Sequence, residues 1–188
     1  MEKYDDTYYI RRIAEGDVHS YAALVSRYSR PLFSLIFKIV RNREDAEELA
    51  QDVFVKVYRS LPGFKGECSF STWIYRIAYN TALSFTRHAK HEWLAFDESI
   101  INNVSEEEVS EALGLLDQSE QLQLLDQALE QLSAEEQALI LLFYRQQKSV
   151  EELAVITGLS QSNVKTKLYR IRKKLFVLIK TMEAHSNE

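Results

Sequence analysis

The chain of 188 residues is poor in the residues that form tight turns and disulfides. It contains only five glycines, two prolines and one cysteine, Cys68. Such scarcity of turn formers argues against a hairpin-rich fold and favours helices. A single cysteine cannot form an internal disulfide, so a reducing compartment is expected. No run approaches the roughly 18 consecutive apolar residues of a membrane-spanning helix, and no secretory signal is visible. We therefore expect a cytoplasmic protein.

Signatures of catalysis are also absent from the sequence. The four histidines, at positions 19, 88, 91 and 185, have no metal-ligand spacing, and Cys68 has no catalytic partner that the sequence identifies. There is no Gly-rich loop of the kind that binds phosphate groups. The sequence therefore predicts a protein that is not an enzyme, with no metal, no cofactor and no small-molecule substrate.

Basic residues are missing from one long segment. Residues 91–130 contain no Lys or Arg and 11 Asp and Glu. Residues 1–90 have 14 basic and 11 acidic residues, and residues 131–188 have 9 and 6, so each end has a net charge of +3. Charge alone favours a solvated linker. The alternative is a segment that repels DNA between two DNA-facing modules.

Apolar residues recur at helical spacing in most of the remaining sequence, and no repeat of 20–50 residues is visible. We expect a helix over residues 4–14, one capped by Asp17, a new one started by Pro31, one over 44–61 capped by Asn42, and one over 69–88. After a linker with transient helix near 106–116, helical spacing resumes at residue 121. The prediction is an all-α protein in which an N-terminal helical bundle (1–91) and a C-terminal helix-turn-helix bundle (120–188) are joined by an acidic linker (92–119).

The C-terminal residues have the pattern of a helix-turn-helix. Ser133 and Ser149 each precede a Glu by three residues, which is a capping box that starts a helix. Residues 149–157 then form a short helix, 158–160 a tight turn with glycine, and 161–178 a longer helix. Residues 160–180 include seven basic residues and no acidic one. Docking in the DNA major groove explains this pattern better than a solvated basic face does. The candidate DNA contacts are Ser162, Lys165, Thr166, Tyr169, Arg170 and Lys173.

A second candidate DNA surface lies on the predicted helix 69–88 and on the loop before it. Aromatic, amide and guanidinium groups follow one another at spacings of three and four residues, opposite the apolar stripe. Such groups bind single-stranded DNA by stacking, by hydrogen bonds and by neutralising phosphates. The loop has two glycines and could close around a base taken out of the stack. Packing in the core is the alternative for the tryptophan. The candidates are Phe64, Lys65, Trp73, Arg76, Asn80 and Arg87.

A third candidate surface is the acidic side of the predicted helix 44–61. Asp45, Glu48, Gln51 and Asp52 lie opposite its apolar stripe. Composition alone favours a solvated outer face. The functional alternative is a docking face for a basic partner, whose orientation complementary charge would set.

Two sets of motifs resemble a known family. The segment from Asp45 to Phe54 (DAEELAQDVF), the loop Phe64-Lys65-Gly66, and FSTWIYRIA from Phe70 with Asn80 resemble the second conserved region of bacterial sigma factors. LSAEE from Leu132, SVEELA from Ser149 and VKTKLYR from Val164 resemble their fourth region. The chain as a whole resembles the extracytoplasmic-function (ECF) group of the sigma-70 family.

The resemblance implies a dissociable subunit of bacterial RNA polymerase that binds the core enzyme, recognises two promoter elements and helps to melt the DNA. In the family, the helix matching 44–61 docks on the clamp helices of the largest core subunit, which adds Phe54 to that face. The candidate residues on the helix 69–88 and on the loop before it match the part of the family that captures one flipped non-template base of the downstream promoter element. The helix with Lys165 matches the part that reads the upstream element. Many relatives have Arg there, and an ammonium cannot bind guanine in the bidentate way of a guanidinium. An anti-sigma protein, membrane-bound in many cases, is the further implied partner.

Two other classes of protein remain open at this point. A helix-turn-helix repressor or activator would act without being a polymerase subunit, and it would bind duplex DNA alone, usually as a dimer. No coiled-coil seam for such a dimer is visible in the sequence. A helical adaptor that binds only protein would leave the charge of residues 160–180 unexplained.

Overall fold

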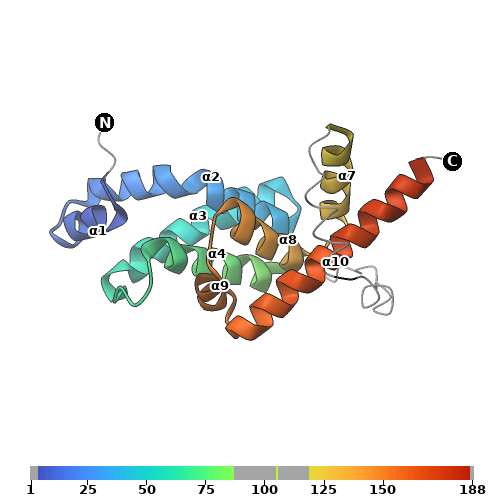
Figure 1. The fold of residues 1–188 in the computed structure, drawn as a ribbon. Helices are drawn as coiled ribbons and strands as arrows, with labels where there is room; N and C mark the ends of the chain where they lie inside the picture. Colours follow the sequence, from blue (N-terminus) through green and yellow to red (C-terminus); the bar gives the residue numbers. More distant parts are fainter. Residues whose placement is uncertain (1–3, 87–104, 106–118, 187–188) are drawn as a thin grey trace.

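The computed structural model describes residues 4–86, residue 105 and residues 119–186. Within these ranges every regular element is helical, as Figure 1 shows, and the all-α prediction is confirmed. None of the described helices is both long enough and apolar enough to cross a membrane. The predicted transient helix near 106–116, the boundary at residue 91 and Arg87 all lie outside the described residues.

The N-terminal part is a helical bundle. Its elements are α1 (Asp6–Ala14), the 3-10 helix η1 (Val18–Ser20), α2 (Tyr21–Val40), α3 (Arg43–Ser60), the 3-10 helix η2 (Leu61–Gly63) and α4 (Phe70–Thr86). Helices α2, α3 and α4 pack against one another. The predicted cap of α3 is confirmed, since the Asn42 side chain accepts a hydrogen bond from the Asp45 N–H at 3.1 Å. Asp6 ties α1 to α2 by accepting hydrogen bonds from Arg27 and Tyr28.

Pro31 does not start a new helix, so that prediction is wrong. Helix α2 continues through Pro31 without a break. A proline inside a helix loses one backbone hydrogen bond and costs about 3 kcal/mol. Leu24 and Tyr28 before it, and Leu32 and Leu35 after it, are all buried along one stripe. Burial of that continuous stripe outweighs the local preference of proline.

Asp17 is the N-cap residue of η1, as the sequence predicts, but the expected cap by its side chain does not form. Its side chain makes no capping hydrogen bond to the helix that follows. It instead accepts hydrogen bonds from Arg12 at 2.8 Å and from the Ser20 hydroxyl at 2.9 Å. The nearby guanidinium offers a charge-assisted partner, which competes with a neutral backbone N–H for the same oxygen.

The C-terminal part contains the predicted helix-turn-helix. Its elements are α7 (Ser119–Glu130), α8 (Ala134–Ile140), a π-helical turn η3 (Leu141–Arg145), α9 (Val150–Thr157) and α10 (Gln161–Ser186). Both predicted capping boxes are present, Ser133 with Glu136 and Ser149 with Glu152. Gly158 has the expected positive φ of 75°, and the Ser160 hydroxyl accepts from the Asn163 N–H at 3.2 Å.

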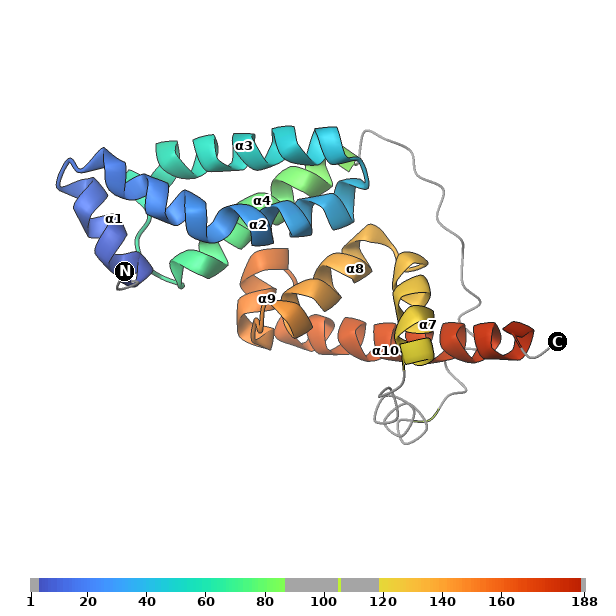
Figure 2. The same ribbon diagram turned by 90° about the horizontal axis from the view of Figure 1, so that it is seen from above.

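The two parts of the chain pack side by side (Figure 2). Helix α9 lies against α4, and α8 lies against α2. Their buried side chains join into a single apolar cluster. The sequence predicts two bundles and a linker, and the structure adds a direct contact between the bundles.

Candidate functional site

The loop between η2 and α4 rests on a cluster of aromatic rings. The Trp73 ring centroid lies 4.9 Å from that of Phe64 and 5.8 Å from that of Phe70. Phe70 also packs against Tyr28, at 5.6 Å. The two loop-flanking aromatics therefore close over the indole, and Trp73 is only 8% exposed. The prediction of an exposed stacking ridge is wrong for this residue, because the loop folds back on it. Its alternative, packing in the core, is what the structure has.

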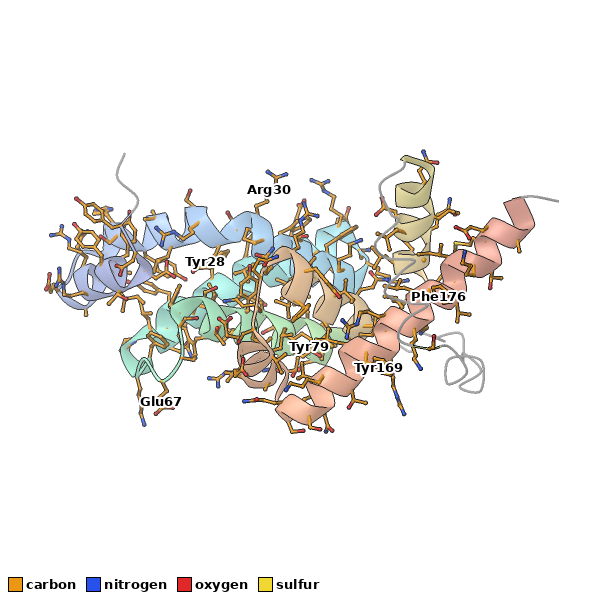
Figure 3. All side chains as sticks on the ribbon, in the orientation of Figure 1. Tyr28, Arg30, Glu67, Tyr79, Tyr169 and Phe176 are labelled. Carbon is orange, nitrogen blue, oxygen red and sulfur yellow. The ribbon has the colours of Figure 1, made fainter. Side chains whose placement is uncertain are left out.

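The other described members of the predicted downstream DNA surface are accessible. Arg76 and Asn80 lie four residues apart on α4, on one exposed side that we call the α4 ridge. Lys65 is exposed in the loop, and Phe64 is half-buried. Gly66 has φ 72°, a conformation that glycine adopts at no steric cost. Figure 3 shows Glu67 at the tip of this loop, pointing away from the helices.

The outer side of α3 combines polar and apolar side chains. Glu48, Gln51 and Asp52 are exposed, whereas Asp45 and Phe54 are half-buried. The Phe54 carbonyl accepts a hydrogen bond from the Tyr21 hydroxyl at 2.7 Å, which fixes the middle of α3 on α2.

Two exposed apolar residues on α3 were not identified from the sequence. Val55 is 48% exposed and Tyr58 is 41% exposed. They continue the row of Glu48 and Gln51 at spacings of three and four residues. Their position off the buried stripe was the sequence signal that could have found them. We call Glu48, Gln51, Asp52, Val55 and Tyr58 the α3 face.

Helix α10 presents its first turns to solvent. Ser162, Lys165, Thr166 and Arg170 are exposed, and we call them the α10 face. The Thr166 hydroxyl donates to the Ser162 carbonyl at 3.0 Å. Leu153 and Ile156 of α9 are buried together with Val164 and Leu168 of α10. This shared core sets the angle at which α10 projects from the turn at Gly158.

The basic residues of α10 fall into separate groups. Lys167 and Lys174 form ion pairs with Glu135 at 3.6 Å and Glu136 at 3.0 Å, both from α8. Tyr169 is half-buried, and the Lys173 ammonium lies 4.7 Å from the centre of its ring. Lys173 is only 7% exposed. It was predicted to contact a DNA phosphate from an exposed face of the helix, and the structure contradicts that exposure. The aliphatic stem of a lysine packs on apolar surface, and the ring holds its charged end.

Within the described residues, no group of three or more His, Cys, Asp or Glu side chains is arranged to hold a metal ion. What the described surfaces offer is hydrogen-bond donors, aromatic rings and charges of both signs.

Family models match both parts of the chain. The model described as Sigma-70 region 2 matches residues 24–92. The model described as Sigma-70, region 4 matches residues 122–175. The first therefore covers most of α2 and all of α3, the loop and α4, and the second covers most of α7 to α10, in the order that the sequence motifs predict.

Curated relatives match the chain over part or nearly all of their length. The RNA polymerase sigma-H factor of Pseudomonas aeruginosa is 39% identical over 77 residues, 41% of this chain and 40% of that protein. The ECF RNA polymerase sigma-E factor of Haemophilus influenzae is 39% identical over 84 residues, 45% of this chain and 44% of that protein. Each of these matches therefore spans less than half of the relative. The sigma-E factor of Escherichia coli is 29% identical over 178 residues, 92% of this chain and 93% of that protein.

Two solved structures share the fold. CnrH, in complex with the cytosolic domain of CnrY, has a TM-score of 0.65 and 22% identity, covering 94% of this chain and 97% of that chain. The sigma factor RpoE from Bartonella quintana, in complex with the anti-sigma factor NepR, has a TM-score of 0.62 and 22% identity, covering 87% and 98%. With both conserved regions matched in order on one helical fold, the chain belongs to the sigma-70 family, in its ECF group.

Proposed function

We propose that this protein is an alternative sigma factor that binds core RNA polymerase in the cytoplasm, recognises two promoter elements and helps to melt promoter DNA. One observation carries the proposal. The chain matches both conserved regions and has three exposed surfaces on separate elements, namely the α3 face, the α4 ridge with its loop, and the α10 face. A repressor or activator would need only the last of these.

The α3 face is proposed to bind the core enzyme. Its carboxylates suit a basic partner, and complementary charge speeds encounter and fixes orientation. Val55 and Tyr58 add exposed apolar area beside these charges. A mixed surface of this kind suits a tight but reversible contact, because apolar burial supplies affinity and charge supplies specificity. The phosphodiester chemistry then belongs to the polymerase.

The α4 ridge is proposed to bind the melted downstream element. Asn80 can donate to and accept from a base edge, and Arg76 and Lys65 can neutralise phosphates. The glycines beside Lys65 allow the loop to move toward an unstacked base. Trp73 is proposed to support the loop rather than to touch the base, because its ring packs against Phe64 and anchors the start of the loop.

The α10 face is proposed to read the upstream element. Its N-terminal residues would enter the major groove, where Lys165 and Thr166 can reach base edges or phosphates and Arg170 can reach the backbone. A lysine at position 165 donates as a point charge, so its preference for guanine is weaker than that of an arginine.

An anti-sigma protein is the further proposed partner. Both structural neighbours share this chain's fold, and one is described in complex with an anti-sigma factor. The acidic segment 92–119 is proposed to follow positively charged channels of the core enzyme.

Reconstituted run-off transcription tests the proposal. Purified bacterial core polymerase is combined with a library of genomic fragments from the source organism, with and without this protein. Specific transcripts that start only when the protein is added would support it. Tight duplex binding without core, and no transcripts, would contradict it and favour a repressor.

A further inference from the structure

A lysine near the middle of α10 is buried without a carboxylate beside it. Lys173 is only 7% exposed, and lysines are seldom buried to this degree unless they are paired. The other buried lysine of the described residues, Lys148, forms an ion pair with Glu152 at 2.8 Å. Among residues 4–86 and 119–186, no carboxylate pairs with Lys173, and its ammonium lies instead 4.7 Å from the centre of the Tyr169 ring. The contact that accounts for this buried cation is therefore with an aromatic ring.

Lys173 and Tyr169 lie on successive turns of α10, on one side of the helix. Residues four apart are neighbours there, and long helical side chains lean toward the N-terminus. The Lys173 side chain therefore reaches back to Tyr169, and the Tyr169 ring leans in turn toward Lys165 and Thr166. Figure 3 shows Tyr169 between the start of α10 and Phe176. The ring thus lies next to the turns that are proposed to enter the major groove.

The contact with Lys173 fixes the orientation of the ring. An ammonium is attracted to the face of an aromatic ring, and the attraction is stronger where water is excluded, as it is around a buried side chain. Leu168, the residue before the tyrosine, is buried and anchors this turn. Tyr169 itself is half-buried, so part of its ring stays open to solvent beside the exposed Arg170. A ring held in this way loses little conformational freedom when it meets a ligand.

The open part of the Tyr169 ring suits one feature of duplex DNA. The major groove presents hydrogen-bonding atoms and, at thymine, a C5 methyl group, which apolar side chains contact. The exposed cations Lys165 and Arg170 suit base edges and phosphates instead. An ammonium that is buried against a ring is not available to a phosphate in the same arrangement. The geometry therefore separates the roles of these side chains.

We infer that Lys173 is a positioning residue: its buried ammonium holds the Tyr169 ring, and the ring recognises the methyl group of one thymine in the upstream promoter element. The inference rests on the proposed sigma-factor function. It predicts that Lys173 affects the sequence preference of the protein and leaves the number of its phosphate contacts unchanged. It also gives a reason for the burial of a basic residue on a helix that is proposed to bind DNA.

Lys173→Met is the variant that tests this inference, because methionine keeps an unbranched side chain without the ammonium. Lys173→Arg retains a cation that can stack on the ring, and it should restore the wild-type behaviour. Tyr169→Ala removes the ring itself. Lys180→Met is the matched control, since Lys180 is an exposed lysine of the same helix that pairs with Glu183 at 2.9 Å.

The first measurement is promoter binding by holoenzyme, assembled from core polymerase and the full-length protein. Each thymine of the upstream element is replaced in turn by deoxyuridine, which pairs in the same way but lacks the methyl group. We expect wild type, Lys173→Arg and Lys180→Met to bind about fourfold more weakly when one particular thymine is replaced, the effect of one buried methyl group. Tyr169→Ala and Lys173→Met should bind both DNAs equally. A helix that was merely destabilised would weaken binding to both DNAs alike and leave their ratio unchanged.

Two results of this scan would overturn the inference. One is the full fourfold effect in Lys173→Met, because the ring would then be positioned without the ammonium. The other is the lack of any thymine whose methyl group matters to the wild-type protein.

The second measurement is the salt dependence of promoter binding, which tests whether Lys173 contacts a phosphate instead. Loss of a phosphate contact lowers the slope of log K against log salt by about 1. We expect the slope of Lys173→Met to equal that of wild type and the slope of Arg170→Ala to be lower. A lowered slope in Lys173→Met would overturn the inference. If wild-type holoenzyme binds its promoter but shows no methyl effect, this inference alone fails. If no promoter-specific holoenzyme forms at all, the proposed sigma-factor function fails, and this inference fails with it.

Discussion

The indole of Trp73 lies 4.9 Å from the ring of Phe64, and this contact connects the first turn of α4 to the loop that precedes it. The tryptophan therefore belongs to the framework beneath the loop rather than to its exposed surface. Phe70 and Tyr28 extend the same cluster into the core of the N-terminal part. The conformation of the loop is thus determined by packing from below.

Trp73→Ala should destabilise the protein by about 3–5 kcal/mol, since a large buried ring is replaced by a cavity. Trp73→Phe keeps most of the packing and should cost less. Urea unfolding measures both free energies. A loss below about 1 kcal/mol for Trp73→Ala would show that the indole does not support the loop.

Asn80→Ala should leave the free energy of unfolding within about 0.5 kcal/mol of wild type, because the side chain is exposed. It should slow open-complex formation about tenfold or more while closed-complex binding stays intact, because the amide is proposed to bind a base only after melting. Stopped-flow fluorescence with a base analogue in the downstream element measures the rate of opening. Equal rates for variant and wild type would remove Asn80 from the base-binding surface.

The sequence predicts local features of this fold well. Asn42, Ser133 and Ser149 were all identified as helix caps, and each cap joins groups no more than three residues apart. Composition and helical spacing likewise predict the helix-turn-helix, because its turn needs a glycine with positive φ and its core needs a fixed apolar spacing.

Predictions that depend on distant residues are less successful. Pro31 looks like a helix start until the buried stripe on both sides of it is known. Trp73 looks exposed on a helical wheel until Phe64 folds over it. The bond between Thr72 and Glu152 joins residues 80 positions apart, and nothing in the local sequence of either residue indicates it.

Replacing Glu48 and Asp52 by lysine should weaken binding to core polymerase about tenfold or more, because both side chains belong to the α3 face and the change reverses its charge. Glu15→Lys is the control, since Glu15 is an exposed acid on another element, at the end of α1. Fluorescence anisotropy with labelled protein measures both affinities. Loss of affinity in the control as well would indicate a general charge effect rather than a docking face.

Replacing Lys165 and Arg170 by alanine should weaken upstream-element binding by the holoenzyme and reduce its dependence on salt, because two cations of the α10 face are lost. Core affinity should not change. Lys167→Ala is the control, since Lys167 is paired with Glu135. Footprinting at several salt concentrations measures the effect. Equal loss of core and promoter binding would indicate misfolding instead.

The free energy of unfolding should depend on pH because Glu152 is charged in the folded protein. Burial acts to raise its pKa, but hydrogen bonds from Lys148, Thr72 and Ser149 outweigh burial and lower the pKa from its ordinary value of 4.5 to about 2. A lowered folded-state pKa means that the unfolded chain binds the proton more tightly, so the stabilisation is complete above about pH 4.5 and is lost as pH falls toward 2. Glu152→Gln cannot lose a charge, so its stability should fall less steeply across this window. Urea unfolding at several pH values compares the two slopes. Parallel slopes would show that the charge of the Glu152 carboxylate does not stabilise the folded protein.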